Sequence, residues 1–262
     1  MKTSLVIATY NWSEALELIL LSLLKQSMLP NEILIADDGS TKKTKEVIEK
    51  YTQHFHSGIK HIWQKDVGFR KTIILNKTIA QATGDYIIQI DGDIVLHQHF
   101  IKDHIQVAKA GAFIHGSRVF LNKKTTQQSI LKSNSKFSIF TYGISNRFNA
   151  LHSPILSELF SNQNRNLKGT RGCNFSFWRE DFIIINGYNE DMIGWGKEDT
   201  ELSVRLMNSG LQKHKLKCLA VCYHLHHTLS SRSGLNINNT ILDLAIKNKT
   251  HICTNGINKY AN

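Results

Sequence analysis

The stretch GDYIIQIDGDI, residues 84–94, decides the fold class of this chain. Its run of β-branched and aromatic residues is typical of a buried strand, and the strand ends in the acidic triplet DGD. Two earlier runs have the same plan, since SLVIAT at 4–9 is followed by polar YN and EILIAD at 32–37 leads into DDGS. Helical periodicity occupies residues 13–27, the segment after the second run, and residues 70–82. This alternation predicts an α/β fold with a mostly parallel central sheet, Rossmann-like, and helices on both faces.

Polar residues stand where each of the three predicted strands ends. Parallel strands bring their carboxyl ends to one edge of a sheet, and open α/β sheets bind ligands at that edge. Asp, Asn, Gly and Ser are also ordinary turn formers, which is the simpler explanation for any one cluster. Three such clusters at one edge favour a binding site.

The composition indicates a globular protein with an anionic partner. The chain has 262 residues, of which 41% are hydrophobic and 20% charged, so it is long enough for a large core and is not a disordered chain. Lys and Arg number 32 against 21 acids, a net charge of +11. Nucleotide phosphates, an anionic lipid surface and nucleic acid all fit this charge.

The cysteines and the N-terminus predict a cytoplasmic protein. Four cysteines without repeated spacing are expected to be reduced thiols. The first residues lead directly into a strand pattern, without the apolar core of a secretory signal. The longest apolar run, LELILLSLL, is too short to span a bilayer.

The chain is expected to form one main domain over residues 1–235, followed by a helical extension at 236–262. Within the domain we expect a nucleotide-binding half at 1–115, a loop-rich insertion at 122–166 and an acceptor and catalytic half at 167–235. The insertion mixes basic and aromatic residues, which suits contact with lipid or an extended acceptor, or a solvated flap with a small apolar cluster.

The DGD triplet is the first candidate for chemistry. Asp91 and Asp93 bracket Gly92 at the end of a buried strand, so both carboxylates can face one point. Carboxylate oxygens suit Mg²⁺ or Mn²⁺, and such an ion would neutralise a departing diphosphate. A single DxD triplet also arises by chance in many loops.

The second candidate is GWGKEDTELSVRL, residues 194–206, in which Trp195 precedes Glu198 and Asp199 at the predicted start of a helix. Acidic residues favour a first helical turn whatever their function. Helix capping does not require Trp195, however, and an indole beside a carboxylate offers a flat face for a sugar ring and a base for its hydroxyl.

The third candidate is YHLHH, which ends at His227 and follows the strand-like run CLAVC. An imidazole there is suited to complete the metal site begun by the aspartates. Histidines without a ligand are one alternative, and a structural zinc site with Cys218 and Cys222 is another, although the spacing fits no common zinc site.

Taken together, the motifs resemble a known family. The order TYNW, ADDGST, GFRKTIILN, GDYIIQIDGDI, RGCNFSFWREDF, NGYNEDMIGWGKEDTEL and YHLHH resembles the inverting glycosyltransferases of family 2, which have the GT-A fold. The C-terminal part also resembles the galactosyltransferase and chondroitin-polymerase type. The resemblance runs from Ser4 to about His227, and the order of several motifs makes it more specific than DGD alone.

The resemblance implies a binding site for a nucleotide-sugar donor. The first two strand ends would hold the nucleoside, with Asp37 or Asp38 at the uracil or ribose. Arg70 and Asn76 would lie against the nucleotide and diphosphate, and Asn174 would touch the donor sugar. The implied donor-binding residues are Thr9, Tyr10, Asn11, Asp37, Asp38, Arg70, Asn76, Asp91, Gly92 and Asn174.

The resemblance also implies the metal and the reaction. Asp91 and Asp93 would frame Mn²⁺ or Mg²⁺, with His224 as a further ligand and His227 as the second choice. Asp199 would remove the proton of the acceptor hydroxyl as that oxygen displaces the nucleotide, which inverts the sugar configuration. Glu198 would hold the acceptor or orient its loop, and Trp195 would stack on the acceptor ring.

The expected function is therefore transfer of a hexose or N-acetylhexosamine from a UDP-sugar to a glycan or glycolipid hydroxyl in bacterial surface polysaccharide or lipopolysaccharide synthesis. Galactose or its N-acetyl relative is slightly preferred. Peripheral contact with the inner face of an anionic membrane fits the charge.

Three alternatives remain at this stage. A sugar nucleotidyltransferase would carry a glycine-rich, arginine-containing loop after the first strand, where this chain has ATYNWSEA. A basic nucleic-acid-binding module would carry a recognition motif, and none is found, so no nucleic-acid partner is expected. A catalytically silent relative that binds UDP is disfavoured by the presence of both DGD and GWGKED.

Overall fold

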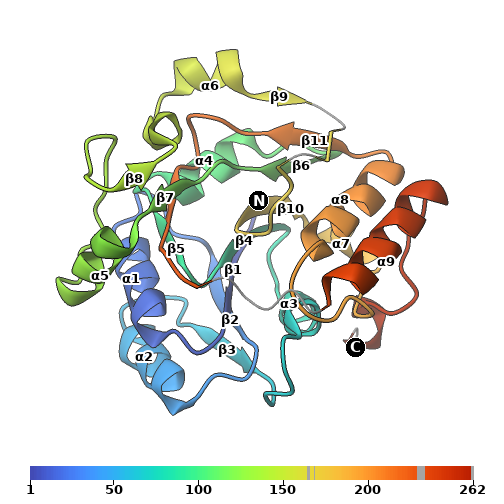
Figure 1. The fold of residues 1–262 in the computed structure, drawn as a ribbon, viewed down its shortest axis with the longest axis horizontal. Coiled ribbons are helices and arrows are strands. Elements are labelled where there is room, and N and C mark those ends of the chain that lie inside the picture. The colour runs from blue at the N-terminus through green and yellow to red at the C-terminus, as the bar shows by residue number, and fades with distance from the viewer. Residues whose placement is uncertain (164–165, 168, 229–233, 261–262) are drawn as a thin grey trace.

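The computed structural model describes residues 1–163, 166–167, 169–228 and 234–260, and its centre is an eight-stranded sheet (Figure 1). In spatial order the strands are β3 (Lys60–Trp63), β2 (Glu32–Asp37), β1 (Thr3–Thr9), β4 (Tyr86–Asp91), β10 (Asn174–Trp178), β6 (Ala112–His115), β11 (Gln212–Lys215) and β9 (Asn162–Gln163).

The first four strands of this order are parallel, as the βαβ pattern predicts. The predicted strands β1, β2 and β4 begin and end within one residue of the expected positions. Thr9 at the end of β1 pairs with Asp37 of β2, and Ala8 pairs with Asp91 of β4. The three polar strand ends therefore meet at one edge of the sheet.

Two features of the sheet differ from the simplest expectation. β10 runs antiparallel to both β4 and β6, so the sheet is parallel on one side of it and mixed on the other. β3 lies at one edge of the sheet, and only Ile62 among its residues is buried. Its sequence therefore has no apolar run from which a strand could be predicted.

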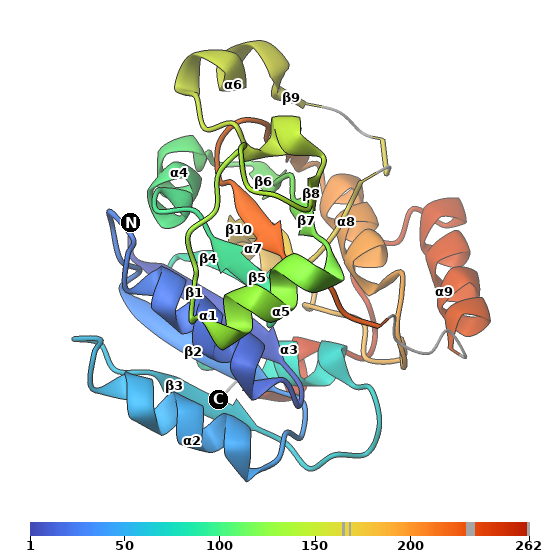
Figure 2. The ribbon, with the colours of Figure 1, turned by 60° about the vertical axis from the view of Figure 1, so that its left-hand side comes forward.

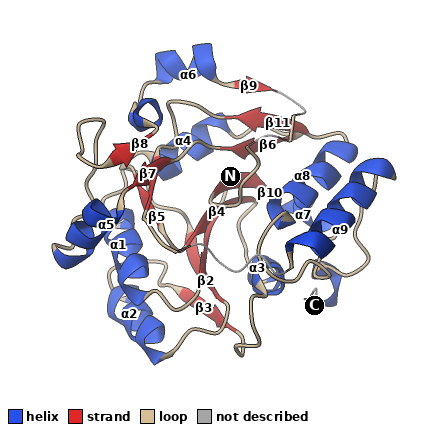
Figure 3. Cartoon of the chain, in the orientation of Figure 1, coloured by secondary structure: helices blue, strands red, loops and turns tan. Residues whose placement is uncertain are grey.

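Helices cover both faces of the central sheet (Figures 1 and 3). Residues on β1 alternate between the faces, since Leu5 and Ile7 belong to one apolar cluster and Val6 and Ala8 to the other. The first cluster contains residues of α1 (Ser13–Leu23), α2 (Lys42–Thr52) and α4 (Phe100–Val107). The second contains residues of α3 (Lys71–Ala80), α7 (Arg179–Ile184) and α8 (Glu198–Asn208).

A second, four-stranded sheet brings the distant histidines to the DGD triplet. Its order is β5 (Ile94–Leu96), β12 (Cys222–His224), β7 (Val119–Leu121) and β8 (Ile144–Ser145). β5 follows DGD directly, and β12 pairs with it so that His224 lies opposite Ile94. The backbone N–H of Leu225 donates to the carbonyl of Asp93 at 2.9 Å, which extends the pairing to the triplet itself.

The segment expected to be a loop-rich insertion contains short regular elements. Besides β8 and β9 it holds α5 (Lys123–Leu131), a 3-10 turn η1 (Arg147–Ala150) and α6 (Pro154–Phe160). Asn122 caps α5 and Ser153 caps α6 through their side chains, which explains helices in so polar a segment. Figures 1 and 2 both place α6 at the outer edge of the molecule, at the opposite end from α2. Residues 164–165, at the end of the expected insertion, lie outside the described residues.

The expected C-terminal helix is present as α9 (Leu235–Lys247). It packs on α8 through Val204, Leu242 and Ala245, and a second 3-10 turn, η2 (Ile257–Tyr260), follows. Throughout the described ranges, every helix is too short or too polar to cross a membrane.

Candidate functional site

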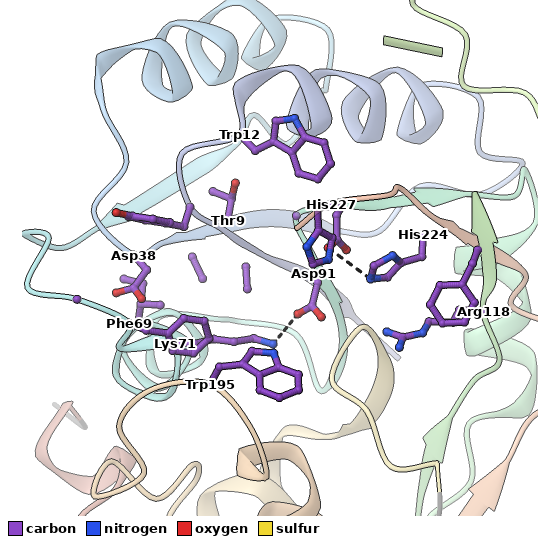
Figure 4. Close-up of a pocket in the computed structure, with 18 residues that line it drawn as sticks. Thr9, Trp12, Asp38, Phe69, Lys71, Asp91, Arg118, Trp195, His224 and His227 are labelled. Atoms are coloured by element: carbon purple, nitrogen blue, oxygen red, sulfur yellow. Dashed lines mark hydrogen bonds and ion pairs between the residues drawn. The ribbon is translucent and has the colours of Figure 1, made fainter. Parts of the chain in front are cut away.

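A cavity of about 590 Å³ opens at the edge of the sheet where β1, β2 and β4 end (Figure 4). Asp38 and Arg118 lie at its two ends, with Asp91 and His227 between them. Nine residues predicted for the site line this cavity: Thr9, Tyr10, Asp38, Asp91, Gly92, Asp93, Trp195, His224 and His227. The structure thus brings residues from all three sequence candidates to one cavity.

Asp93, His224 and His227 form a group suited to a divalent metal ion. One ligand atom from each lies within 4.8 Å of the others. Asp93 Oδ2 is 3.5 Å from His224 Nε2 and 3.1 Å from His227 Nε2. Asp93 Oδ1 is buried without a hydrogen-bond partner, so it has a lone pair available for an ion. Two imidazole nitrogens and a carboxylate fit Mn²⁺ and similar ions.

The Asp93 carboxylate affects the pKa of both histidines. The hydrogen bond from His227 to Asp93 raises the pKa of His227 to about 9. Burial lowers the pKa of His224, although the Asp93 carboxylate opposes this effect. The negative charge of Asp93 is therefore partly balanced by the His227 imidazolium, as it would be by a cation.

Asp91 lies outside this group, because it forms an ion pair with Lys71. The Lys71 ammonium is 2.6 Å from Asp91 Oδ1 (Figure 4). Burial alone would lower the pKa of Lys71, but the carboxylates of Asp91, Asp199 and Glu198 raise it well above its usual value. The Lys71 charge therefore interacts both with Asp91 at the end of β4 and with Glu198 and Asp199 on α8.

Asp199 lies behind the cavity wall, and hydrogen bonds hold both of its oxygens. Oδ2 accepts from the backbone N–H of Gly172 at 2.6 Å, and Oδ1 accepts from the Tyr188 hydroxyl at 3.1 Å. A Cβ atom at position 172 would collide with this carboxylate, so glycine is needed for the close approach. Two donors on separate segments thus fix the orientation of Asp199.

Glu198 and Trp195 stand beside Asp199 on the GWGKED segment. Glu198 is 5% exposed, and its Oε2 accepts from the backbone N–H of Gly196 at 3.0 Å. Burial, together with the Asp199 charge, raises the pKa of Glu198 to about 7. Trp195 lines the cavity on the side of Lys71, across from Trp12 (Figure 4). Neither Glu198 nor Asp199 is among the residues that line the cavity.

Asp38 rather than Asp37 reaches the cavity at its other end. Asp38 accepts from Gln64 Nε2 at 2.6 Å and from the backbone N–H of Arg70 at 2.7 Å. Asp37 is 1% exposed. Its carboxylate is hydrogen-bonded to His61 and accepts from the backbone N–H of Ser40, so it stabilises the loop that follows β2.

The loop after β1 contributes two side chains to the cavity. Thr9 Oγ1 is buried without a partner, and the Tyr10 hydroxyl donates to Asp66 at 2.9 Å. Asn11 has a left-handed backbone with φ of 46°, and its side chain accepts from the Thr41 N–H. Asn11 thus shapes the turn and does not line the cavity.

Besides Asn11 and Asp37, three further residues predicted to bind the donor do not line the cavity. Asn76 is fully buried and bridges the carbonyl of Tyr188 at 2.8 Å and Glu190 at 2.9 Å. Asn174 is 1% exposed and its amide donates to the carbonyls of Ser117 and Ala220, both at 2.9 Å. The Arg70 guanidinium turns to the carbonyl of Lys65 at 2.6 Å. The core binds both asparagine amides, whereas the loop binds only Nη2 of Arg70 and leaves its buried Nε without a partner. Local sequence does not reveal these arrangements.

Sequence reasoning missed several residues of the cavity: Trp12, Phe69, Lys71, Arg118 and Phe120. Lys71 follows Arg70 in the GFRK motif, so the sequence alone shows a second basic residue at the start of that helix. Nothing local to Arg118 marks it, because it reaches the cavity only through the pairing of β7 with β12.

Comparison with known families assigns most of the chain. Residues 4–183 match the model of glycosyl transferase family 2, and residues 157–228 match a model described as the N-terminal domain of galactosyltransferase. The two matches overlap over residues 157–183, between the DGD triplet and the GWGKED segment.

Curated relatives are glycosyltransferases of greater length. Validoxylamine A glucosyltransferase of Streptomyces hygroscopicus subsp. limoneus is 25% identical over 221 residues, which are 79% of this chain and 48% of that protein. Chondroitin synthase of Escherichia coli is 24% identical over 239 residues, or 84% of this chain and 34% of that protein. The chain thus spans half or less of the length of these two relatives.

Solved structures share the fold. The crystal structure of S. aureus TarS 1–349 in complex with UDP has a TM-score of 0.66 at 18% identity, covering 95% of this chain and 66% of that one. GalNAc-T7 with UDP, GalNAc and Mn²⁺ has a TM-score of 0.64 at 18% identity, covering 87% and 43%. These neighbours are GT-A enzymes, so the predicted GT-A fold is confirmed.

Proposed function

Because this chain belongs to glycosyl transferase family 2, we propose that it transfers a hexose or N-acetylhexosamine from a UDP-sugar to a glycan or glycolipid hydroxyl with inversion. One observation carries the proposal. The metal-type group of Asp93, His224 and His227 shares a cavity with Trp195, while Lys71 links the Asp91 carboxylate to Asp199. A candidate cation site and Trp195 therefore share one cavity, and Lys71 in its wall links that cavity to the candidate base.

The nucleoside is assigned to the end of the cavity formed by Thr9, Tyr10 and Asp38. The Tyr10 ring is 52% exposed, so its face is available to the uracil. Asp38 has a carboxylate able to accept from the uracil N–H or a ribose hydroxyl. Two structural neighbours, TarS and GalNAc-T7, have UDP in their crystal structures, which supports UDP as the carrier.

Asp93, His224 and His227 are assigned to hold Mn²⁺ or Mg²⁺. When bound there, the ion would neutralise negative charge that develops on the departing diphosphate. Lys71 adds a fixed ammonium beside Asp91 at the same place. GalNAc-T7 and the mannosyltransferase PcManGT of Pyrobaculum calidifontis both have Mn²⁺ in their structures, which favours Mn²⁺.

Asp199 is assigned as the base that removes the acceptor proton. Its bonds to Gly172 and Tyr188 stabilise the carboxylate and aim it, while leaving further lone pairs on each oxygen. Trp195 would offer its face to the acceptor ring. Glu198 is assigned to orient its loop, since it is buried and its Oε2 accepts from the backbone N–H of Gly196.

The assignment to a glycosyltransferase family sets aside the nucleotidyltransferase and nucleic-acid-binding alternatives. For the sugar, galactose or N-acetylgalactosamine is proposed first, on the match to the galactosyltransferase model. The pathway proposed is synthesis of a bacterial surface polysaccharide or lipopolysaccharide.

The insertion is proposed to touch the inner face of an anionic membrane from the cytoplasm. Phe140, Tyr142 and Phe148 are 75% or more exposed, and Lys136 and Arg147 belong to the same segment. Exposed aromatic residues with basic neighbours suit a lipid interface. Co-sedimentation with anionic vesicles, compared for the wild type and a Phe140→Ser, Phe148→Ser variant, tests this contact.

The direct test of function is a panel of UDP-sugars with Mn²⁺, with GDP-mannose as the matched control donor. One UDP-sugar should raise the melting temperature and be hydrolysed slowly, because a ligand that binds only the folded state stabilises it. Equal protection by GDP-mannose would reject the UDP assignment. Absence of protection and hydrolysis with every nucleotide sugar would reject the proposed function.

A further inference from the structure

Arg118 occupies the end of the cavity opposite to Asp38 (Figure 4). Its guanidinium carbon lies 4.5 Å from the centre of the Phe120 ring, and its Nη1 donates weakly to Cys173 Sγ at 3.4 Å. Its Nε is buried without a hydrogen-bond partner. A buried guanidinium N–H without an acceptor is costly unless a ligand supplies one.

Three more cations gather next to Arg118, and we call Arg118, Arg171, Lys215 and Lys217 the basic track. Lys215 at the end of β11 pairs with His115 at the end of β6. The carbonyl of Arg171 lies 3.0 Å from Nδ1 of the same His115.

Asn149 connects Lys217 to the cavity. Its side chain accepts from the Lys217 ammonium at 2.9 Å and donates to the carbonyl of Arg118 at 2.9 Å. The basic track therefore connects Arg118 in the cavity with the carboxyl ends of β6 and β11.

The positive charge of the basic track is not balanced locally. Within the described part of the chain, none of its four residues forms an ion pair with a carboxylate. Partial burial and the charge of Arg118 lower the pKa of Arg171, and partial burial, Lys215 and Arg171 lower the pKa of Lys217. Like charges held close without counter-ions create a positive potential that attracts anions.

The basic track starts next to the candidate base. Arg171 immediately precedes Gly172, whose N–H donates to Asp199. Arg171, Lys215 and Lys217 do not line the cavity assigned to the donor. Since Arg171 adjoins the residue that holds Asp199, the inference places the acceptor on this side of the base. An anion bound along them would extend outward from the reacting hydroxyl.

From this arrangement we infer that the basic track binds anionic groups along the acceptor, so that the acceptor is an acidic glycan or a polyol phosphate rather than a neutral sugar chain. The inference rests on the proposed function, because it places the acceptor at Asp199. The shared chemistry is a repeated oxyanion, either a carboxylate or a phosphodiester, which guanidinium and ammonium groups bind through charge-assisted hydrogen bonds.

The test measures binding of three probes to the full chain in the presence of UDP and Mn²⁺. The probes are a hexasaccharide of alternating glucuronate and N-acetylglucosamine, a glycerol phosphate hexamer and a neutral glucose hexamer. One anionic probe should bind at least about tenfold more tightly than the neutral one, and added salt should weaken it. The two anionic arms distinguish carboxylate from phosphodiester.

The variant Arg171→Gln, Lys215→Gln, Lys217→Gln should lose about tenfold or more of this affinity. The matched control Lys42→Gln, Lys43→Gln, Lys45→Gln removes the same charge from exposed positions of α2 and should bind as the wild type does. Thermal protection by UDP and Mn²⁺ should persist in both variants, since these residues lie outside the cavity.

Equal binding of all three probes by the wild type would overturn the inference. So would equal losses in the two triple variants, because a general charge effect would then explain the binding. If the basic-track variant instead loses binding to anionic lipid vesicles while no oligomer binds, the basic track is a membrane contact. If UDP and Mn²⁺ do not raise the melting temperature of the wild type, the proposed function is rejected. That result is independent of whether the three oligomers bind.

Discussion

The Lys71 ammonium lies 2.6 Å from Asp91 Oδ1, so the first aspartate of the DGD triplet is held by a protein cation and not by the group of Asp93, His224 and His227. The Lys71 side chain is 13% exposed and that of Asp91 27%, so the pair is partly shielded from water. The two aspartates therefore have different partners, since Asp91 pairs with Lys71 and Asp93 with the two histidines. The symmetric DGD triplet does not suggest this difference.

Replacing Lys71 with Met is expected to destabilise the protein by about 3 kcal/mol, because Asp91 and its acidic neighbours would lose their compensating charge. The double variant Lys71→Met, Asp91→Asn should recover part of that loss. Urea unfolding of the wild type, both single variants and the double variant measures the coupling. Additive effects of the two substitutions would show that the ion pair contributes nothing.

Replacing His227 with Ala is expected to weaken Mn²⁺ binding at least about tenfold, because one of three ligands is lost. His226→Ala in the same motif is the matched control, since His226 is exposed and lies outside the metal-type group. Titration of Mn²⁺ against the melting temperature compares the two variants. Similar Mn²⁺ responses in both would exclude His227 as a ligand.

Replacing Asp199 with Asn is expected to lower sugar transfer by about a hundred- to ten-thousandfold while UDP still binds, because the base is lost and the carboxamide keeps a similar shape. Asp181→Asn on α7, at a distance from the cavity, should transfer at the wild-type rate. Single-turnover transfer and UDP-dependent melting are the measurements. Near-normal transfer by Asp199→Asn would refute its role as base.

Glu198 is expected to make stability depend on pH. Burial and Asp199 raise its pKa in the folded state from 4.5 to about 7, so between these values the unfolded chain releases the proton more readily than the folded one. The free energy of unfolding should therefore fall as pH rises from about 4.5 to 7, by up to about 3 kcal/mol.

Glu198→Gln should remove this decline, because glutamine does not titrate. Urea unfolding of the wild type and the variant at pH 5, 6, 7 and 8 isolates the contribution as the difference between two curves. Parallel curves across this range would mean that Glu198 ionises normally in the folded protein.

Much of the sheet was predictable because its signals are local. β1, β2 and β4 are continuous apolar runs ended by polar turns, and such runs are strands whatever lies far away in the chain. β3 was not predictable, since an edge strand with one buried side chain needs little apolar sequence. The short helices of the insertion depend on capping side chains in a polar segment, which leaves little periodicity to detect.

The residues of the site likewise divide into those that the sequence predicts and those that only the tertiary structure brings together. The sequence by itself determined that Thr9, Asp38 and the DGD triplet share one edge, because parallel strands carry their carboxyl ends to the same edge of a sheet. The motifs suggested a histidine ligand beside the aspartates, but only the tertiary structure decided that His224 and His227 both lie at Asp93 and that Asp91 lies outside the group, since β12 reaches β5 across more than a hundred residues. It alone also buried Asn76 and Asn174 in the core and placed Lys71 against Asp91. The physical reason is that a polar side chain takes the hydrogen-bond or charge partner that folding brings to it, and sequence spacing does not encode that partner.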